Sequence, residues 1–266
     1  MRQDLAQSGE GSPTVPKAIS NPREFWDRKA ATFPRYSPGE DTYEASLLSL
    51  ASENGASMRN AVALDVGCGT GMFTIRLAME ARKVIAVDIS ERMLDILRED
   101  ARKARLRNIV AVNSDWLDFR VPVRPDIVFC SMSPAIGSEE GRGKLVGLAG
   151  SQVVAVVPTE RFQSQIMAGL YDRYSVTPTY QREGPTLGAW LAGRGIRPTS
   201  VPVTGKWRVP QKLAHIKDSA LCMLHNFGVE PDEGELDEYL EGFRGTDGMY
   251  LEITDYKLEM LLWHNP

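Results

Sequence analysis

The residues of this chain that could do chemistry are gathered around one glycine-rich turn. The turn is Asp65-Val-Gly-Cys-Gly-Thr-Gly71, and it lies between the apolar run 62–66 and a helical pattern that begins near Met72. Glycines can adopt positive φ and let a ligand approach the backbone closely, while the first amides of a helix point toward that ligand. The pattern predicts the strand, turn and helix with which a Rossmann-like sheet binds a cofactor.

The spacing of the glycines separates two classes of cofactor. Only Thr70 stands between Gly69 and Gly71, whereas a dinucleotide fingerprint has two residues at this point, so the spacing disfavours a nicotinamide or flavin site. Asp88 follows Asp65 by 23 residues and ends a second apolar run, 83–89. A carboxylate at the end of that strand can accept hydrogen bonds from two ribose hydroxyls. The sequence therefore predicts a ligand that carries a ribose.

Four segments, in order, resemble the motifs of class I S-adenosylmethionine-dependent methyltransferases. They are Asp65-Val-Gly-Cys-Gly-Thr-Gly71, Val87-Asp88-Ile-Ser90, Asn113-Ser-Asp115-Trp-Leu-Asp118 and Pro125-Asp-Ile-Val-Phe-Cys-Ser131. Together these motifs span roughly residues 61–158. The resemblance implies an enzyme with S-adenosylmethionine as its cofactor and S-adenosylhomocysteine as its product.

The resemblance also implies which residues bind the cofactor. The glycine turn would hold the methionine part, Asp88 the ribose, and Ser114 to Trp116 the adenine. The expected cofactor-binding residues are Asp65, Gly67, Cys68, Gly69, Gly71, Asp88, Ile89, Ser114, Asp115, Trp116, Ser131 and Met132. Each has a plainer alternative: a glycine serves any tight turn, Asp88 could cap the next helix with Ser90, Asp115 could be a loop acid, and Trp116 could belong to the core.

The acceptor is expected to meet the cofactor after the fourth strand, at Ser131-Met-Ser-Pro-Ala-Ile136. Relatives that methylate nucleobase or glutamine amino groups often have Asp or Asn, two prolines and an aromatic residue here, and this chain matches only one proline. Ser133 is nevertheless expected to line the pocket, together with Tyr36 from an aromatic-rich segment before the first strand. Trp26 and Phe33 in that segment are expected to pack a helix onto the sheet.

The sequence does not assign a catalytic residue. Methyl transfer from a sulfonium needs chiefly the alignment of two reactants and the exclusion of water, so it requires no fixed set of side chains. A general base is needed only for an acceptor that is protonated at the working pH. By residue type the candidates are His215, His225, Asp41 and Tyr36.

Composition is that of a globular α/β protein. The chain has 266 residues, 42% of them hydrophobic, and a net charge of -4, which gives no general attraction to phosphate backbones and disfavours a nucleic-acid partner. The basic residues between Arg98 and Arg107 fall on the polar face of a helical pattern. Three scattered cysteines suggest neither disulfides nor a metal site, and no apolar stretch approaches 18 residues, so a reducing cytoplasm and no membrane association are expected. The oligomeric state is left open.

The expected fold is a doubly wound, Rossmann-like, mostly parallel sheet with an antiparallel pair of C-terminal edge strands. Residues 1–21 are expected to form a flexible tail and residues 22–266 a single domain. Its parts are a helical lid at 22–60, a cofactor-binding half at 61–158, and a substrate-side half at 159–266 with a helical insert at 211–245. Strands are expected at 109–115, 126–132, 152–157, 200–209 and 250–263, and helices at 42–52, 160–174, 185–194, 211–226 and 232–243.

These observations predict a methyltransferase that acts on a small-molecule acceptor by in-line displacement. Three alternatives remain open at this point. An RNA or protein methyltransferase would use the same cofactor half, a nucleotide-dependent oxidoreductase fits the glycine spacing poorly, and a cofactor-binding protein without activity would need no catalytic group.

Overall fold

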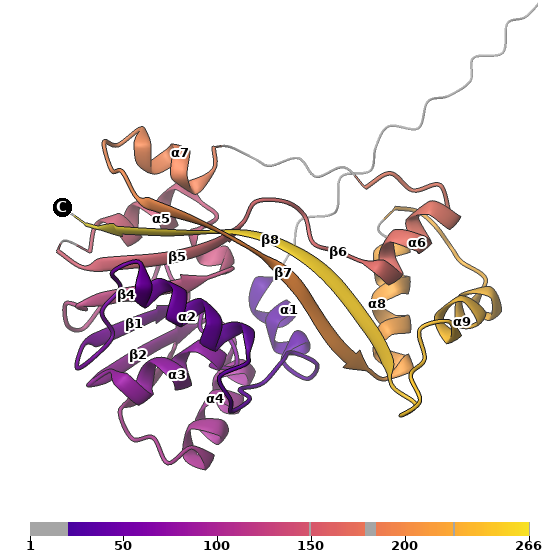
Figure 1. Cartoon of the computed structure of the whole chain (residues 1–266), viewed down its shortest axis with the longest axis horizontal. Coiled ribbons are helices and arrows are strands. Elements are labelled where there is room, and N and C mark those ends of the chain that lie inside the picture. Colours follow the sequence, from indigo (N-terminus) through magenta and orange to yellow (C-terminus); the bar gives the residue numbers. More distant parts are fainter. Residues whose placement is uncertain (1–20, 149, 179–184, 226, 266) are drawn as a thin grey trace, which may run out of the picture. The chain divides into compact units, whose positions relative to one another are not determined.

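The computed structural model describes residues 21–148, 150–178, 185–225 and 227–265 (Figure 1). These residues divide into two compact units. The first holds the described residues up to 162, together with 185–205 and 256–265, and the second holds 163–178 and the described residues of 206–255. Of the tail predicted at 1–21, only Asn21 is described, and its side chain caps the first helix by accepting the amide of Glu24. The domain organisation predicted from the sequence stays a prediction.

A mostly parallel sheet forms the centre of the first unit (Figure 1). Its strands are β1 (Val62–Val66), β2 (Lys83–Asp88), β3 (Ile109–Asn113), β4 (Ile127–Ser131), β5 (Gln152–Pro158) and β8 (Tyr250–His264). They follow the order β3-β2-β1-β4-β5-β8, in which β8 is antiparallel to β5 and the other pairs are parallel. β7 (Thr199–Gln211) also pairs with β8, and the two strands run in opposite directions (Figure 1). The predicted doubly wound sheet and its antiparallel edge pair are confirmed.

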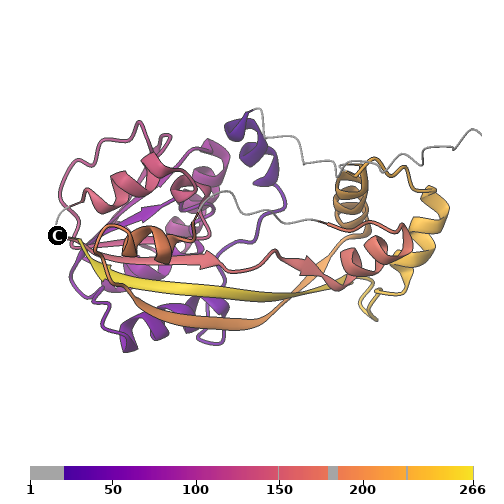
Figure 2. The same ribbon diagram turned by 90° about the horizontal axis from the view of Figure 1, so that it is seen from above.

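Helices cover both faces of this sheet (Figure 2). They are α1 (Pro22–Lys29), α2 (Tyr43–Glu53), α3 (Met72–Glu80), α4 (Glu91–Lys103), α5 (Glu139–Val146) and α7 (Leu187–Ala192), with a 3₁₀ turn η1 (Pro134–Ile136). Side chains fix where several of them begin: Thr42 accepts the amide of Ala45 at α2, and Ser90 accepts the amide of Met93 at α4. Because helices bury both faces, the central strands can be continuous apolar runs, and all five residues of β1 are buried.

The segment before the first strand is bonded to the cofactor half of the same unit. Arg23 donates to the carbonyl of Ile89 and to Asn113 Oδ1, at 2.7 Å in both cases. Asp27 accepts the hydroxyl of Ser90 at 2.6 Å. Farther along, Thr70 donates to the carbonyl of Pro34, again at 2.6 Å. These bonds hold α1 and the residues after it against the carboxyl ends of β2 and β3.

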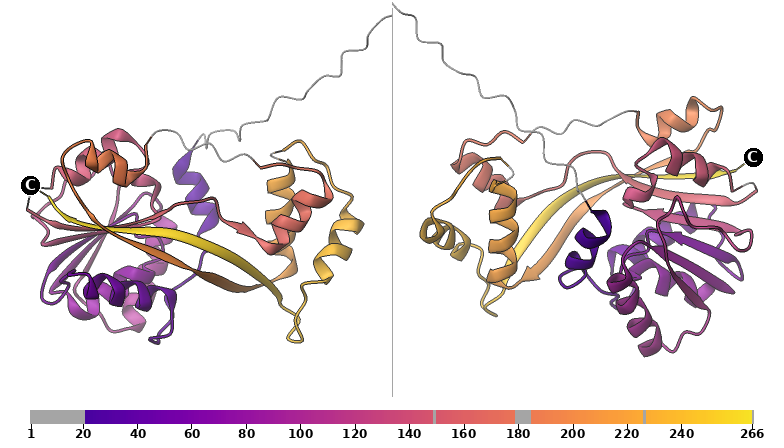
Figure 3. Two further views of the ribbon diagram at one scale, coloured as in Figure 1. Left: turned by 45° about the horizontal axis from the view of Figure 1, so that its top comes forward. Right: turned by 180° about the vertical axis from the view of Figure 1, so that it is seen from behind.

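The helices of the second unit lie near one another (Figure 3), and the unit has a core of its own. It contains β6 (Gln163–Ser164), α6 (Gln165–Arg173), α8 (Leu213–His225) and α9 (Glu233–Glu241). The buried residues of this core are Ile166, Leu170, Ile216, Ala220, Leu224, Leu236, Leu240 and Tyr250. Lys217 ties α8 to α9 through Glu233 and Asp237, at 2.9 Å from each carboxylate. The predicted helical pair thus forms at the expected residues.

One predicted helix begins later than expected. The periodicity predicts a helix from residue 160, but residues 163–164 pair with β8 and α6 begins only at Gln165. The reason is the side chain of Ser164, which accepts the amide of Met167 and so marks the start of the helix. None of the described helices is both long and apolar enough to cross a membrane.

A glycine pair tests how the turn is held against α4. We expect Gly71→Ala to lower the free energy of unfolding by about 2 to 4 kcal/mol, because φ is +86° there and a Cβ would lie 2.2 Å from Leu97 Cδ1. The control is Gly55→Ala, at φ +93° with no neighbour within 4 Å, which should cost about 1 kcal/mol from backbone strain alone. Urea unfolding of both variants measures the difference. Equal losses would show that contact with Leu97 does not matter.

Candidate functional site

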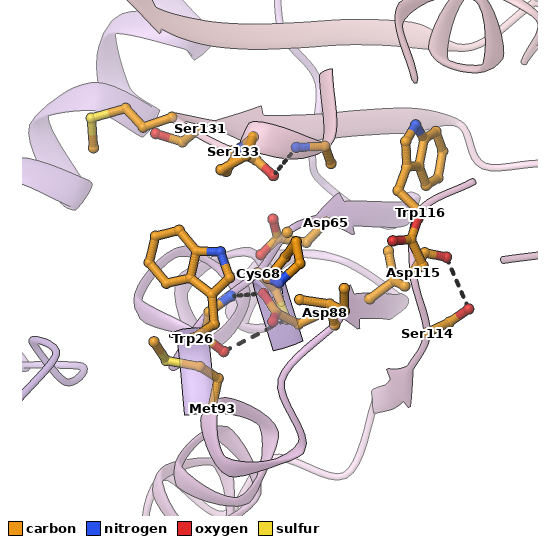
Figure 4. Close-up of a pocket in the computed structure, with 18 of the residues that line it drawn as sticks. Trp26, Asp65, Cys68, Asp88, Met93, Ser114, Asp115, Trp116, Ser131 and Ser133 are labelled. Atoms are coloured by element: carbon orange, nitrogen blue, oxygen red, sulfur yellow. Dashed lines mark hydrogen bonds between the residues drawn. The ribbon is translucent and has the colours of Figure 1, made fainter. Parts of the chain in front are cut away.

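A cavity of about 320 Å³ opens at the carboxyl ends of β1, β2 and β4, inside the first unit (Figure 4). Parallel sheets bind ligands at this edge, where the strand order reverses on either side of β1. The lining residues are Pro22, Trp26, Phe33, Asp65, Gly67, Cys68, Gly69, Met72, Phe73, Val87, Asp88, Ile89, Met93, Ser114, Asp115, Trp116, Leu117, Ser131, Met132, Ser133, Pro134, Ala135 and Ser138. Twelve of these are residues that the sequence predicted for the site, from four separate segments of the chain.

The glycine turn forms the floor of this cavity, with positive φ at Gly67, Gly69 and Gly71. A Cβ on Gly67 would lie 1.9 Å from Ser133 Oγ, so only glycine lets the turn approach the end of β4 so closely. A Cβ on Gly69 would meet open space apart from Phe33 Cε1, 3.7 Å away. Gly71 was expected at the cofactor, but it does not line the cavity. It lies before α3 and makes room for Leu97 instead.

Asp88 joins the turn to the second strand. Its Oδ2 accepts the amide of Gly69 at 2.8 Å, and its Oδ1 accepts the amide of Ser90 at 2.9 Å. Ser90 caps α4 by accepting the amide of Met93, and Asp88 bonds the amide of Ser90 while it lines the cavity. Burial raises the pKa of Asp88, while the backbone amides around it act in the opposite direction. Carboxylate oxygens have further lone pairs, so both oxygens of Asp88 can still accept hydrogen bonds from the hydroxyl groups of a ligand.

Asp65 is a second buried carboxylate in the cavity, only 3% exposed. Loss of hydration raises its pKa to about 7. The hydrogen bond that Thr74 Oγ1 donates to it at 2.6 Å acts in the opposite direction and lowers the pKa. The nearby charge of Asp88 raises the pKa of Asp65 further. Two carboxylates close together in a cavity of low polarity favour a ligand that brings positive charge.

The loop after β3 forms a third side of the cavity, where Figure 4 shows Ser114, Asp115 and Trp116 together. The amide of Ser114 bonds the carbonyl of Asp88 at 3.0 Å. Trp116 is 5% exposed, and its indole N–H donates to the carbonyl of Gly141 at 3.0 Å. Lys144 lies over its ring at 4.6 Å and donates to the carbonyls of Trp116, Leu117 and Phe119. Trp116 thus both belongs to the core and lines the cavity.

The end of β4 supplies the last side, with Ser131, Met132 and Ser133. Met132 has φ +50°, a conformation that costs free energy in a residue other than glycine and that is common at functional sites. Ser131 lies beside the hydroxyl of Tyr43, whose pKa is raised by burial. Ser133 accepts the amide of Ala135 at 3.3 Å, and its hydroxyl is also in hydrogen-bond contact with the thiol of Cys130.

The prediction for the N-terminal segment chose the wrong aromatic residue. Tyr36 does not line the cavity, and its ring lies under the guanidinium of Arg76, 5.5 Å away. Trp26 and Phe33, expected to be packing residues, both line the cavity, with their ring centroids 6.2 Å apart. The richness of this segment in aromatic residues was a usable signal, but it does not say which ring faces inward. The sequence also missed Phe73 and Met93.

The candidates for a general base do not gather at the cavity. Asp41, like Tyr36, is not among its lining residues. His215 and His225 belong to the second unit, where both are exposed and His225 pairs with Glu230 at 3.0 Å. Within the described residues no three side chains of the metal-binding types lie close enough to share an ion.

Comparison with known families gives the same assignment as the geometry. Residues 63–146, about a third of the chain, match a family model described as "Methyltransferase domain". This match contains the glycine turn, Asp88, the loop after β3 and the end of β4. Residues 63–146 form a methyltransferase domain of the class I S-adenosylmethionine-dependent superfamily.

Two curated proteins are similar to this methyltransferase domain and its flanks. One is a probable ribosomal RNA small subunit methyltransferase A from Methanosphaera stadtmanae, 28% identical over 139 residues, which are 51% of this chain and 51% of that protein. The other is a magnesium-protoporphyrin O-methyltransferase from Rhodobacter capsulatus, 39% identical over 61 residues, which are 23% and 26%. The matched region spans about half the length of the first relatives.

Among solved structures, a magnesium protoporphyrin IX methyltransferase from Synechocystis has the same fold as this methyltransferase domain. Its TM-score is 0.51 at 15% identity, and the match covers 90% of this chain and 96% of the other. At that identity the likeness concerns the fold alone.

The raised pKa of Asp65 predicts a pH dependence of stability. The folded protein keeps a proton on Asp65 up to about pH 7, whereas the unfolded chain releases it near pH 3.8, so stability falls as pH rises between these values and is then level. From pH 5 to pH 8 this group should cost about 2 to 3 kcal/mol, which Asp65→Asn should remove.

Thermal unfolding of the wild type and of Asp65→Asn at the two pH values measures this cost. Asp118→Asn, which changes an exposed aspartate in the loop after β3, controls for the loss of one charge. If the melting temperatures of Asp65→Asn and the wild type change in parallel between the two pH values, the assignment to Asp65 is contradicted.

Proposed function

We propose that this protein is an S-adenosylmethionine-dependent methyltransferase that transfers a methyl group to a small-molecule acceptor. The observation that carries the proposal is a single cavity containing the glycine turn, Asp88 and the end of β4. The family match over residues 63–146 supports the cofactor and the type of reaction. The lining residues fit the cofactor chemically, because two buried carboxylates suit a ligand whose ammonium and sulfonium groups give it net positive charge.

Each side of the cavity would hold one part of the cofactor. The amides and φ-positive backbone of the glycine turn would receive the methionine end, with Asp65 near its ammonium group. Asp88 would accept the two ribose hydroxyls while it keeps its bonds to Gly69 and Ser90. Ser114, Asp115 and Trp116 would bracket the adenine, in a loop that Lys144 holds in place through three carbonyls.

The cofactor would supply an activated methyl group for in-line transfer to a lone pair of the acceptor, with S-adenosylhomocysteine as the second product. The residues of this chain have to orient the acceptor and exclude water. Ser131, Met132 and Ser133 would orient it, since all three line the cavity and Ser133 lies against Gly67 of the turn. Trp26 and Phe33 also line the cavity and would help to exclude water.

A ribosomal RNA acceptor is the second candidate, since the relative from Methanosphaera stadtmanae bears that name. The lining of the cavity favours a small acceptor, because no lysine or arginine stands among the described residues that line it to receive a phosphate.

Binding of the cofactor tests the first part of the proposal. Calorimetric titration should show micromolar binding of S-adenosylmethionine and S-adenosylhomocysteine and none of NADH. Asp88→Ala should weaken binding by about 1.5 to 3 kcal/mol, roughly 10- to 150-fold, because a charged acceptor of two hydroxyl bonds is lost. Asp126→Ala is the matched control: its carboxylate accepts a backbone amide, that of Val62, at the opposite end of β1. Equal affinity of the two variants would refute the role of Asp88.

Transfer of a labelled methyl group tests the acceptor. Purified protein with methyl-labelled S-adenosylmethionine should label a compound in a low-molecular-weight cell extract, and it should not label total RNA or protein from the same cells. Label that appears in RNA and is lost in Asp88→Ala would identify the second candidate as correct.

A further inference from the structure

We propose that the acceptor is a flat, apolar molecule that carries no carboxylate or phosphate on the part that enters the cavity. This inference rests on the proposed function and names the class of substrate. It follows from what lines the cavity beyond the cofactor positions, and from the bonds that three basic side chains near it make.

The part of the cavity not assigned to the cofactor has an aromatic and thioether lining. It consists of Trp26, Phe33, Met72, Phe73 and the turn that begins at Ser133. The ring of Phe73 is packed from behind by Phe129, 4.8 Å away, and by Tyr43, 6.0 Å away, so it cannot turn freely. Phe33 stands over the glycine turn, 3.7 Å from where a Cβ of Gly69 would lie. Such a lining gains free energy mainly by burying apolar surface and stacking on a ring.

The polar groups of this part are hydroxyls. Ser133 and Ser138 each accept a backbone amide, from Ala135 at 3.3 Å and from Gly141 at 3.0 Å. The oxygen of Ser138 keeps its proton to donate, so it can bond a hydroxyl or amine nitrogen of the acceptor, whereas the hydroxyl of Ser133 is in hydrogen-bond contact with the thiol of Cys130. Neutral hydroxyls orient a polar atom but do not replace the hydration of an anion.

Three basic side chains near the cavity are bonded to backbone and side-chain oxygens and do not line it. Arg23 is bound by Ile89 and Asn113, and Arg76 by the oxygens of Ser37, Gly39 and Thr42. Lys144 is bound by three carbonyls behind the loop after β3. The charged residues that line the cavity are all carboxylates, Asp65, Asp88 and Asp115. An acceptor carboxylate or phosphate would lose its hydration there, find no basic group, and meet negative charge.

A matched pair of small probes tests the inference. Naphthalen-2-ol and naphthalene-2-carboxylate share one ring system and at pH 7 differ by one negative charge. Ligand-observed NMR titrations are run with the full chain saturated with S-adenosylhomocysteine. We expect the neutral probe to bind at least tenfold more tightly. Equal or tighter binding of the carboxylate would overturn the inference, and so would the absence of binding by the neutral probe, because an apolar aromatic cavity has to accept a flat ring.

A matched pair of variants shows whether the probe binds in this cavity. Phe33→Leu removes a lining ring, and Tyr36→Leu removes a ring from the same segment that does not line the cavity. The first should weaken naphthalen-2-ol at least fivefold and the second should leave it unchanged, with both variants melting near the wild-type temperature. Equal effects of the two substitutions would place the probe elsewhere and overturn the inference.

Failure of this inference can be told apart from failure of the proposed function. Calorimetry with S-adenosylhomocysteine alone decides whether the cofactor binds. If it does not, the proposed function fails, and the same probe titrations without S-adenosylhomocysteine still show whether the cavity rejects the charged ring.

Discussion

The hydrogen bond from the Gly69 amide to the Asp88 carboxylate is the interaction on which the rest of the site depends. Through it, the turn after β1 is held at the end of β2, although the two residues belong to different strand–helix units. The other oxygen of Asp88 accepts the amide of Ser90, which in turn caps α4 and bonds Asp27 of α1. One carboxylate thus joins the turn, two strands and two helices at the edge where the cavity opens.

This arrangement leaves negative charge in a place of low polarity. Asp65 and Asp88 are both partly or wholly removed from water, and the pKa of each is raised by burial. Such a site is costly for the unliganded protein and is relieved when a positively charged ligand enters. The same charges make the cavity unsuitable for an anion, since the basic side chains around it are bound to carbonyl oxygens. Selection of the cofactor and rejection of anionic acceptors therefore have one physical cause.

The aromatic wall shows where sequence reasoning reached its limit. The segment from 25 to 36 was rightly singled out for its rings, yet Tyr36 was chosen and Trp26 and Phe33 line the cavity. Trp26 lies on α1, which is held by bonds of Arg23 and Asp27 to residues more than sixty positions away. Phe33 and Tyr36 follow α1, in the segment that Thr70 bonds at the carbonyl of Pro34. Gly71 is a similar case, because the reason for its glycine is Leu97 of another helix.

The sequence by itself determined the parallel sheet, the glycine turn, and most residues that line the cavity. These follow from local rules: apolar runs of strand length, glycines where φ must be positive, and acidic residues at strand ends. Only the tertiary structure decided that Asp88 bonds the turn, that Trp116 belongs to the core as well as to the cavity, and which rings line the cavity. These depend on side chains brought together from distant positions, and the periodicity of a single segment carries no information about its partners.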